Sequence, residues 1–246
     1  VVLDVFDSAF LKWNAPRWVV RLGQRLSYAL PKKILVTDEE RAALMPAYTH
    51  SRLAIVPNYP FRYDGPVHKR DPQVVCILHA GSLMERRGSA FLRELLAVAD
   101  DVRVVMAGWI RDELTKELSQ HPRVEWLGTI PQHESIEQAT RCDFILCHYP
   151  PINQNNIYAS PNKIYDAIQA GTGIIINPEA RISAFVRQHG MGVVLDAYQP
   201  ADLKLVARQL REFKAAYHPD PKLREEFVWE KVEPLLLAAH GAPGKN

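Results

Sequence analysis

The chain has 246 residues, of which 47% are apolar and 24% are charged, which is the balance of a globular protein with one large domain or two small ones. Its formal net charge of +2 is too small to indicate a nucleic-acid partner through bulk electrostatics. The cysteines Cys76, Cys142 and Cys147 lack paired metal-binding spacing and indicate reduced thiols in a cytoplasmic protein, and no stretch reads as a signal peptide or a membrane span.

The first sixty residues predict the end of an α/β domain. We expect a strand at 1–8, a helix at 14–30, a strand that turns into a helix at 32–45, and a strand at 53–58. A capping box from Thr37 to Glu40 predicts the start of the second helix. These elements are too few for a complete α/β domain, so we assign 1–62 to a partial amino-terminal domain. The sequence begins at Val1 without Met, and we therefore expect a truncated or processed chain.

A linker and a larger domain follow. Residues 57–73 contain four prolines and no periodicity, and we place the linker at 63–73. Strands are then predicted at 74–81, 102–108, 124–128, 143–149, 173–176 and 192–196, with helices at 88–99, 110–119, 133–140, 161–170, 181–188, 200–216 and 221–240. Apolar strands separated by helices predict a doubly wound, Rossmann-like parallel sheet covered on both faces. We assign 74–225 to this domain and 226–246 to a terminal helix.

The segment "YASPNKIYDAIQAGTGIII" (158–176) predicts a helix with an anion-binding start. Ser160 is a suitable N-cap, Pro161 suits the first helical position, and Gly171 supplies the left-handed stop. Backbone N–H groups at 161–163 carry partial positive charge, and Lys163 adds a full one. Ligands of open parallel sheets lie beyond the carboxyl ends of the strands, where this helix starts. Ser160, Pro161, Asn162 and Lys163 are therefore candidates for binding a diphosphate.

Asp166 lies one turn into the same helix, where its carboxylate can accept hydrogen bonds from the hydroxyls of a sugar ring. A plainer reading stays open, because many α/β helices are capped in this way and Asp166 would then be solvated.

The loop "HAGSLMERRG" (79–88) is a second candidate site. A strand ends at Gly81, the backbone turns, and Arg86 or Arg87 arrives before the next helix. A guanidinium suits phosphate because its planar fork donates two hydrogen bonds at once. The spacing from Gly81 to Gly88 fits neither the dinucleotide-binding fingerprint nor a phosphate loop with lysine. The alternative is a solvated basic pair before a helix.

Weaker signals lie at the ends of two further strands. "MAGW" (106–109) and "WLGTI" (126–130) place Gly108, Trp109, Gly128, Thr129 and Ile130 at the same sheet edge, where exposed backbone can flank a flat base. Trp109 also reads as an ordinary core or rim aromatic. His79 and His148 each follow a strand, and a lone histidine is more often structural than functional.

Residues 12–33 hold six basic residues and no acid. Arg17, Arg21 and Arg25 form one helical row beside an apolar row of Trp18, Leu22 and Leu26. Such a helix is compatible with peripheral contact to an anionic membrane. The favoured alternative is an ordinary helix whose apolar face packs on the missing part of the amino-terminal domain.

Taken in order, six segments resemble the carboxyl-terminal half of GT-B glycosyltransferases, in particular the large retaining family that uses nucleotide sugars. They are "GSLMERRG", "VVMAGW", "VEWLGTIP", "CDFILCHYP", "SPNKIYDAIQAGTGIII" and "FVWEKVEPLLLAAHG". The resemblance covers about residues 53–241, and "VVLDVFDS" resembles the late part of the amino-terminal, acceptor-side domain. It implies that 74–225 binds the donor and that the last helix crosses back to the amino-terminal domain, with Trp229 and Glu230 at the kink.

The resemblance also implies roles for single residues. The family's Gly-Arg-Leu-x-x-x-Lys-Gly motif matches Gly81 and Gly88, with Arg87 in the place of the lysine and Ser82 in the place of the arginine. Of the family's Glu-x7-Glu motif, Asp166 occupies the place of the second acid, which holds the ribose. Tyr158 stands where the first acid would be. The family frequently has a histidine where this chain has Phe6.

The implied activity is transfer of a hexose from a nucleotide diphosphate sugar, with UDP or GDP, to a glycan or lipid-linked acceptor, without a metal or other cofactor. Arg87 and Lys163 are the expected catalytic residues, because they would stabilise the charge of the leaving diphosphate. We expect little turnover from this chain alone. A non-catalytic nucleotide-binding subunit and a nucleotide-sugar epimerase of the same fold remain alternatives. The expected location is cytoplasmic, with or without membrane contact.

Overall fold

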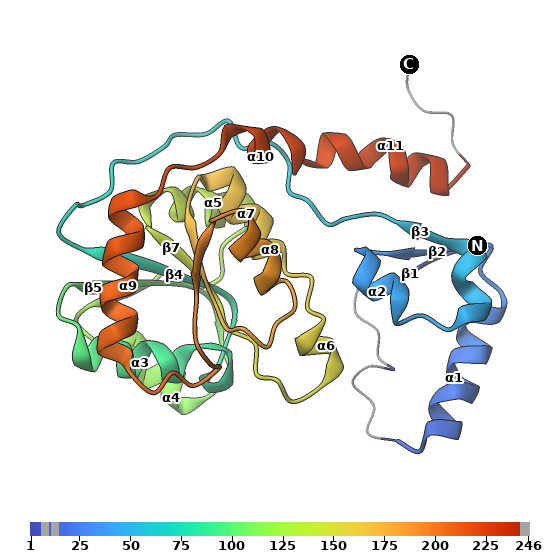
Figure 1. Ribbon diagram of the computed structural model, residues 1–246, viewed down its shortest axis with the longest axis horizontal. Helices are drawn as coiled ribbons and strands as arrows, with labels where there is room; N and C mark the ends of the chain where they lie inside the picture. Colours follow the sequence, from blue (N-terminus) through green and yellow to red (C-terminus); the bar gives the residue numbers. More distant parts are fainter. Residues whose placement is uncertain (6–9, 11–14, 242–246) are drawn as a thin grey trace.

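The larger of two parallel sheets dominates the molecule (Figure 1). The computed structural model describes residues 1–5, 10 and 15–241. Six strands lie in the order β6-β5-β4-β7-β8-β9, all parallel, which is the doubly wound arrangement that the sequence predicted. Their bounds are β4 Val75–Leu83, β5 Val102–Ile110, β6 Val124–Trp126, β7 Phe144–Cys147, β8 Gly173–Ile176 and β9 Gly192–Val194.

Helices cover both faces of this sheet because successive strand residues point to opposite sides. Ile77 lies in one core cluster and Leu78 in the other, and both are fully buried. One face is covered by α3 (Ser89–Val98), α4 (Glu113–Ser119) and α9 (Leu203–Ala216). The other is covered by α5 (Gln132–Arg141), α7 (Asn162–Ala170) and α8 (Ser183–Gln188). We call residues 75–226 the carboxyl-terminal unit.

The strand order reverses between β4 and β7, which pair side by side although 60 residues of other elements separate them. In open parallel sheets, the crevice beyond the carboxyl ends of such a strand pair is the usual ligand site. The loops that follow β4 and β7 meet at this point. They contain the short helix η3 (Glu85–Arg87) and the helix α6 (Gln154–Ile157), neither of which the sequence predicted.

A smaller parallel sheet forms the amino-terminal unit, the described residues of 1–55. It contains β1 (Val2–Asp4), β2 (Lys33–Val36) and β3 (Leu53–Ile55), with α1 (Arg17–Ala29), α2 (Glu39–Ala43) and a 3-10 helix, η2 (Ala47–Arg52). The predicted Thr37 capping box is wrong. The N-cap of α2 is Asp38, whose carboxylate accepts from the Arg41 backbone N–H at 2.7 Å, whereas Thr37 donates its hydroxyl to Asp38. An ionised carboxylate is the stronger acceptor of the two.

Helix α1 carries an exposed apolar row. Trp18, Leu22 and Leu26 are 70%, 52% and 69% exposed, so within the described residues this row packs on no core. The part of 12–33 before residue 15, and Phe6, lie outside the described residues. Within the same described part, no helix is long and apolar enough to cross a bilayer.

Two stretches of chain connect the units (Figure 1). Residues 56–74 run without regular structure, and α11 (Trp229–Ala239) returns after α10 (Pro221–Glu226). The single helix predicted at 221–240 is therefore wrong. At the break between the two helices, Val228 is completely buried, and the Phe227 ring packs against the Tyr59 ring with 5.2 Å between the ring centroids. The Trp229 N–H donates to Pro60 O at 2.7 Å, which joins the two connections.

Candidate functional site

Three glycines lie side by side near the carboxyl ends of β4, β5 and β6: Gly81 and Gly108 precede the last residue of their strands by two positions, and Gly128 follows β6 by two. Gly81 and Gly108 are partners in the sheet register, and the Gly108 N–H donates to Gly128 O at 2.7 Å. Gly108 has φ 144°, and a Cβ added there would lie 1.9 Å from Gly81 O. Only glycine allows these backbones to approach so closely. The result is an edge without side chains, beside which Trp109 is 45% exposed.

The loop after β4 directs Arg87 toward β7. Gly88 has φ 121°, and a Cβ added there would lie 2.5 Å from Leu146 Cδ2, so only glycine lets this turn press against the neighbouring strand. The Arg87 guanidinium lies 5.3 Å above the Tyr149 ring, and its Nη2 donates to Asn156 Oδ1 at 3.4 Å. Arg86 is exposed on the outer side, where its backbone carbonyl accepts from Tyr198 at 2.7 Å.

The start of α7 differs from the prediction by one residue. Its N-cap is Pro161 in extended conformation and its first residue is Asn162, and no side chain caps it, so Ser160 is not the N-cap. A contact from the connecting segment 56–74 reaches this helix start, where Asn58 Nδ2 donates to Asn162 Oδ1. The helix ends at Gly171 with φ 63°, which confirms the predicted left-handed stop.

Lys163 crosses from α7 toward the end of β4. A Cβ at Gly81 would lie 3.9 Å from Lys163 Cε, an ordinary van der Waals contact, so the lysine side chain passes directly beside Gly81. The Lys163 ammonium donates to Leu146 O at 3.3 Å. Burial lowers the pKa of Lys163, and the nearby Arg87 lowers it further.

Asp166 is buried on the inner side of α7, only 8% exposed. Its Oδ1 accepts from Gln132 Nε2 at 2.9 Å. Burial raises the pKa of Asp166 to about 7, although the hydrogen bond from Gln132 and the charge of Lys163 oppose that shift. The plainer reading of Asp166 as a solvated residue is therefore wrong.

A pocket of about 390 Å³ lies between these elements. The predicted residues that line it are Ser82, Arg87, Ser160, Pro161, Asn162 and Lys163, and the other lining residues are Arg41, Tyr149, Asn155, Asn156 and Ala159. Gly81, Arg86, Gly108, Trp109, Gly128, Thr129, Ile130 and Asp166 do not line it. Among its described lining residues Arg41, Arg87 and Lys163 are cations and none is acidic. We call it the anion pocket, because an anion is the ligand that such a lining favours.

Sequence reasoning missed two of the lining residues that matter most. Asn155 is 6% exposed, and its Oδ1 is a buried acceptor without a hydrogen-bond partner among the described residues. The run of asparagines at 153, 155 and 156 was the available signal. Arg41 comes from the amino-terminal unit, and no local signal marks it.

His79 and His148 are both buried, 0% and 5% exposed, but only His148 follows its strand, because His79 lies within β4 and the prediction that it follows a strand is wrong. Burial lowers the pKa of His79 well below its usual value and that of His148 to about 4. Both rings are therefore neutral at pH 7, and His148 stacks between Phe91 and Tyr198. These contacts are those of structural histidines.

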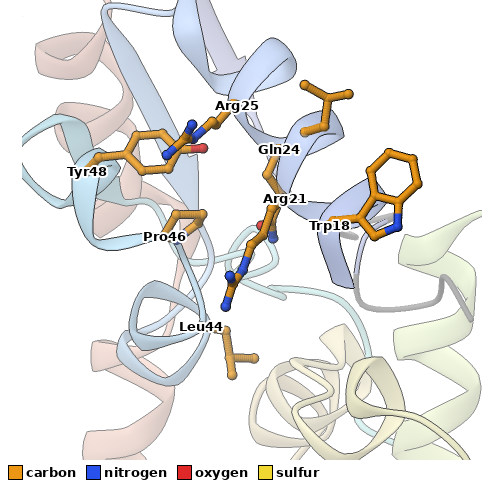
Figure 2. A pocket seen from close by; sticks show the side chains of 8 residues that line it. Trp18, Arg21, Gln24, Arg25, Leu44, Pro46 and Tyr48 are labelled. Carbon is orange, nitrogen blue, oxygen red and sulfur yellow. The ribbon is translucent and has the colours of Figure 1, made fainter. Parts of the chain in front are cut away.

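A second, larger pocket of about 650 Å³ lies between α1 and the segment that contains α2 and η2 (Figure 2). Arg21 extends toward Leu44, and Arg25 lies beside the ring of Tyr48. Trp18 also lines this pocket, so basic and aromatic side chains of α1 face Tyr48 of η2 across it.

No protein-family model matches the sequence, and no curated protein sequence matches it. Solved structures do match. HepE from Anabaena, in complex with UDP and glucose, has a TM-score of 0.71 at 13% identity, over 98% of this chain and 71% of HepE. WaaG, a glycosyltransferase of lipopolysaccharide biosynthesis, has a TM-score of 0.61 at 15% identity, over 99% of this chain and 75% of WaaG. Sucrose-phosphate synthase from Thermosynechococcus elongatus has a TM-score of 0.65 at 14% identity, over 97% of this chain and 66% of that protein. The chain therefore has a Rossmann-like α/β fold of the kind found in GT-B glycosyltransferases.

Proposed function

We propose that the anion pocket binds the diphosphate of a nucleotide sugar, and that the protein transfers a hexose from it to a glycan or lipid-linked acceptor. The observation that carries this proposal is the position of Arg87 and Lys163, which line one pocket at the point where the strand order reverses. That point is the usual ligand site of such sheets. The neighbour HepE was solved with UDP and glucose, which supports the same class of ligand here.

The chemistry depends on charge at the leaving group. When the bond between the anomeric carbon and the diphosphate oxygen breaks, the acceptor oxygen bonds to that carbon and its proton is released, while negative charge develops on the nucleoside diphosphate. Arg87 and Lys163 stabilise that charge from a partly buried site, where electrostatic interactions are stronger than in water. We propose that the reaction is retaining and that these cations take the place of a metal ion.

The rest of the donor lies along the glycine edge of the sheet. Gly108 and Gly128 offer backbone without side chains, against which a flat base can lie. We propose that Asp166 accepts a ribose hydroxyl, which requires the Gln132 side chain to give up its hydrogen bond to Asp166. Asn155 Oδ1 is a buried acceptor on the pocket wall without a partner among the described residues, and it suits a sugar hydroxyl.

A second function, nucleotide binding without turnover, is favoured by one observation. Tyr158 stands where the related enzymes have the first acid of their paired motif, and its carbonyl is held by Arg41. With a tyrosine at this position, the protein has no carboxylate there to contact the donor sugar.

Calorimetry with UDP and with GDP tests the proposal. We expect saturable binding, no requirement for a divalent cation, and a loss of about 10- to 100-fold in affinity for Arg87→Ala, since charge-assisted hydrogen bonds to phosphate are the strong ones. Absence of binding for both nucleotides contradicts the proposal. Binding without transfer of labelled hexose to an acceptor extract supports the second function instead.

We also propose that the exposed row of α1 lies on an anionic membrane surface, which suits a lipid-linked acceptor and a peripheral cytoplasmic enzyme. Arg17, Arg21 and Arg25 flank this row. Sedimentation with vesicles that contain anionic lipid, compared with neutral vesicles, tests it. Equal partition into both vesicle types contradicts the membrane contact.

A further inference from the structure

Two cysteines lie in contact at the amino end of the larger sheet, the end away from the anion pocket. Cys76 is the second residue of β4, and Cys142 caps the end of α5, shortly before β7 begins. Both are free thiols, and their Sγ atoms lie 3.1 Å apart. The two sulfurs of a disulfide are about 2.0 Å apart, so a movement of about 1 Å brings these sulfurs to bonding distance.

The sheet fixes the backbone on both sides of this contact. β4 and β7 pair in parallel, with Ile77 opposite Phe144. One position earlier, the Asp143 N–H donates to Cys76 O and the Cys76 N–H donates back to Asp143 Oδ2, both at 2.8 Å. Cys142 directly precedes Asp143 in the chain and shares this constraint. The two sulfurs are therefore held in contact by the paired strands and not by a free loop.

The two thiols differ in exposure. Cys142 is fully buried, whereas Cys76 is half-buried at the margin of the core. The hydrogen bond with Cys76, followed by burial, raises the pKa of Cys142 well above its usual value. A thiol is oxidised as its thiolate and only where the oxidant reaches it. Cys76 is therefore the thiol that meets a dissolved oxidant, and Cys142 is the second thiol beside it.

We propose that Cys76 and Cys142 form a redox modification site, in which hydrogen peroxide joins the two thiols as a disulfide that stabilises the carboxyl-terminal unit. Peroxide transfers one oxygen to the Cys76 thiolate, which becomes a sulfenic acid, and its other oxygen leaves as hydroxide and takes up the proton that Cys76 released. The Cys142 sulfur then bonds to the Cys76 sulfur, and the sulfenic hydroxyl leaves as water with the Cys142 proton. Two thiols lose two electrons, which reduce one peroxide to two waters.

The disulfide would connect distant parts of the chain. Cys142 follows Cys76 by 66 residues, and β5, β6, α3 and α4 lie between them. A disulfide that closes so long a loop stabilises the folded state, chiefly because it restricts the unfolded chain. Since the fold already holds the sulfurs in contact, the bond adds little distortion to the native state. We expect oxidation to raise the midpoint of thermal unfolding by about 5 to 10 °C.

Cys147 is the matched control within the same sheet. It is fully buried, like Cys142, and burial raises its pKa to about 12. It ends β7, five residues after Cys142, which is about 16 Å away at the rise of an extended strand. Oxidation that depends only on being a thiol should reach Cys147 as well, whereas oxidation that depends on a neighbouring thiol should spare it.

Thiol counts and the intact mass of the full chain, before and after treatment with hydrogen peroxide, test the proposal. We expect the chain to lose two of its three thiols and about 2 Da of mass, as two thiols give up their hydrogens. Peptide mapping should join the segments that contain Cys76 and Cys142. Cys147→Ser should behave like the unmodified chain, and Cys76→Ser and Cys142→Ser should form no internal disulfide.

Thermal unfolding followed by circular dichroism compares the reduced and oxidised chains. A higher midpoint that dithiothreitol reverses supports the proposal. Retention of all three thiols overturns it, and so does a disulfide that includes Cys147 or an oxidised chain whose midpoint does not rise. If Cys142→Ser fails to fold, Cys76→Ser carries the same test, because Cys76 is only half-buried. None of these outcomes depends on nucleotide binding.

Discussion

The two halves of the carboxyl edge of the larger sheet differ in the kind of residue that forms them. Over β4, β5 and β6 the edge consists of Gly81, Gly108 and Gly128, and backbone approaches backbone. Beside β7 and α7 it forms a pocket whose lining includes two long cationic side chains, Arg87 from the loop after β4 and Lys163 from α7. One half is defined by shape and the other by charge. Substitutions in the glycine half should therefore lower the stability of the fold, and substitutions in the cationic half should weaken nucleotide binding.

The largest effect is expected for Gly108→Ala. The new Cβ would lie 1.9 Å from Gly81 O at a backbone φ of 144°, and the sheet register leaves neither strand free to move. We expect the free energy of unfolding to fall by about 5 kcal/mol, which is enough to unfold a marginally stable domain. Urea unfolding followed by circular dichroism measures it. A loss below about 1 kcal/mol would show that the glycine edge is not rigid.

Asp166→Asn comes next, and its effect depends on pH. The folded state keeps the Asp166 carboxyl protonated up to about pH 7, whereas the unfolded chain ionises it near its ordinary value of 3.8. The folded state therefore binds the extra proton, and stability falls as pH rises from about 4 to 7, by up to about 4 kcal/mol. Asp166→Asn should remove this slope. Urea titrations between pH 4.5 and 8 test it, and an unchanged slope would refute the burial effect.

Arg87→Ala tests the cationic half. We expect nucleotide affinity to fall by about 10- to 100-fold, equivalent to about 1.4 to 2.7 kcal/mol, with little change in unfolding midpoint. Arg86→Ala is the control, because Arg86 is exposed outside the pocket. Calorimetry compares the two. Equal losses for both variants would mean that general surface charge, and not the pocket, attracts the nucleotide.

Gly128→Ala should have the smallest effect and sharpens the comparison within the glycine half. Gly128 also has positive φ, 71°, but a Cβ there would meet nothing within 4 Å. Only the left-handed backbone penalty of about 1 kcal/mol remains. Urea unfolding of this variant beside Gly108→Ala separates backbone strain from steric overlap. If Gly128→Ala lowers the free energy of unfolding as much as Gly108→Ala does, the steric overlap with Gly81 O is not the cause of the larger effect.

The sequence predicts the glycine half better than the cationic half, because its signals are local. Apolar runs define the strands from a few neighbouring residues, and β8 matches its predicted range of 173–176. However, β4 and β5 each continue two residues past the predicted ends at Gly81 and Gly108. The start of α7 was misplaced by one residue, and the contact of Asn162 with Asn58 could not be foreseen because Asn58 lies 104 residues away. Arg41 was missed for the same reason, since only the assembled fold brings it to Tyr158.

The connection between Pro60 and Trp229 restricts how the two units can turn against each other. Two separate crossings would allow each to flex on its own, but the bond from Trp229 N to Pro60 O fastens them together at 2.7 Å. Arg62 adds an ion pair to Glu225 of α10, so the two crossings are joined over several residues and a rotation of one unit must bend both. Arg41 and Asn58 precede this joint in the chain, so such a rotation would disturb their contacts with Tyr158 and Asn162.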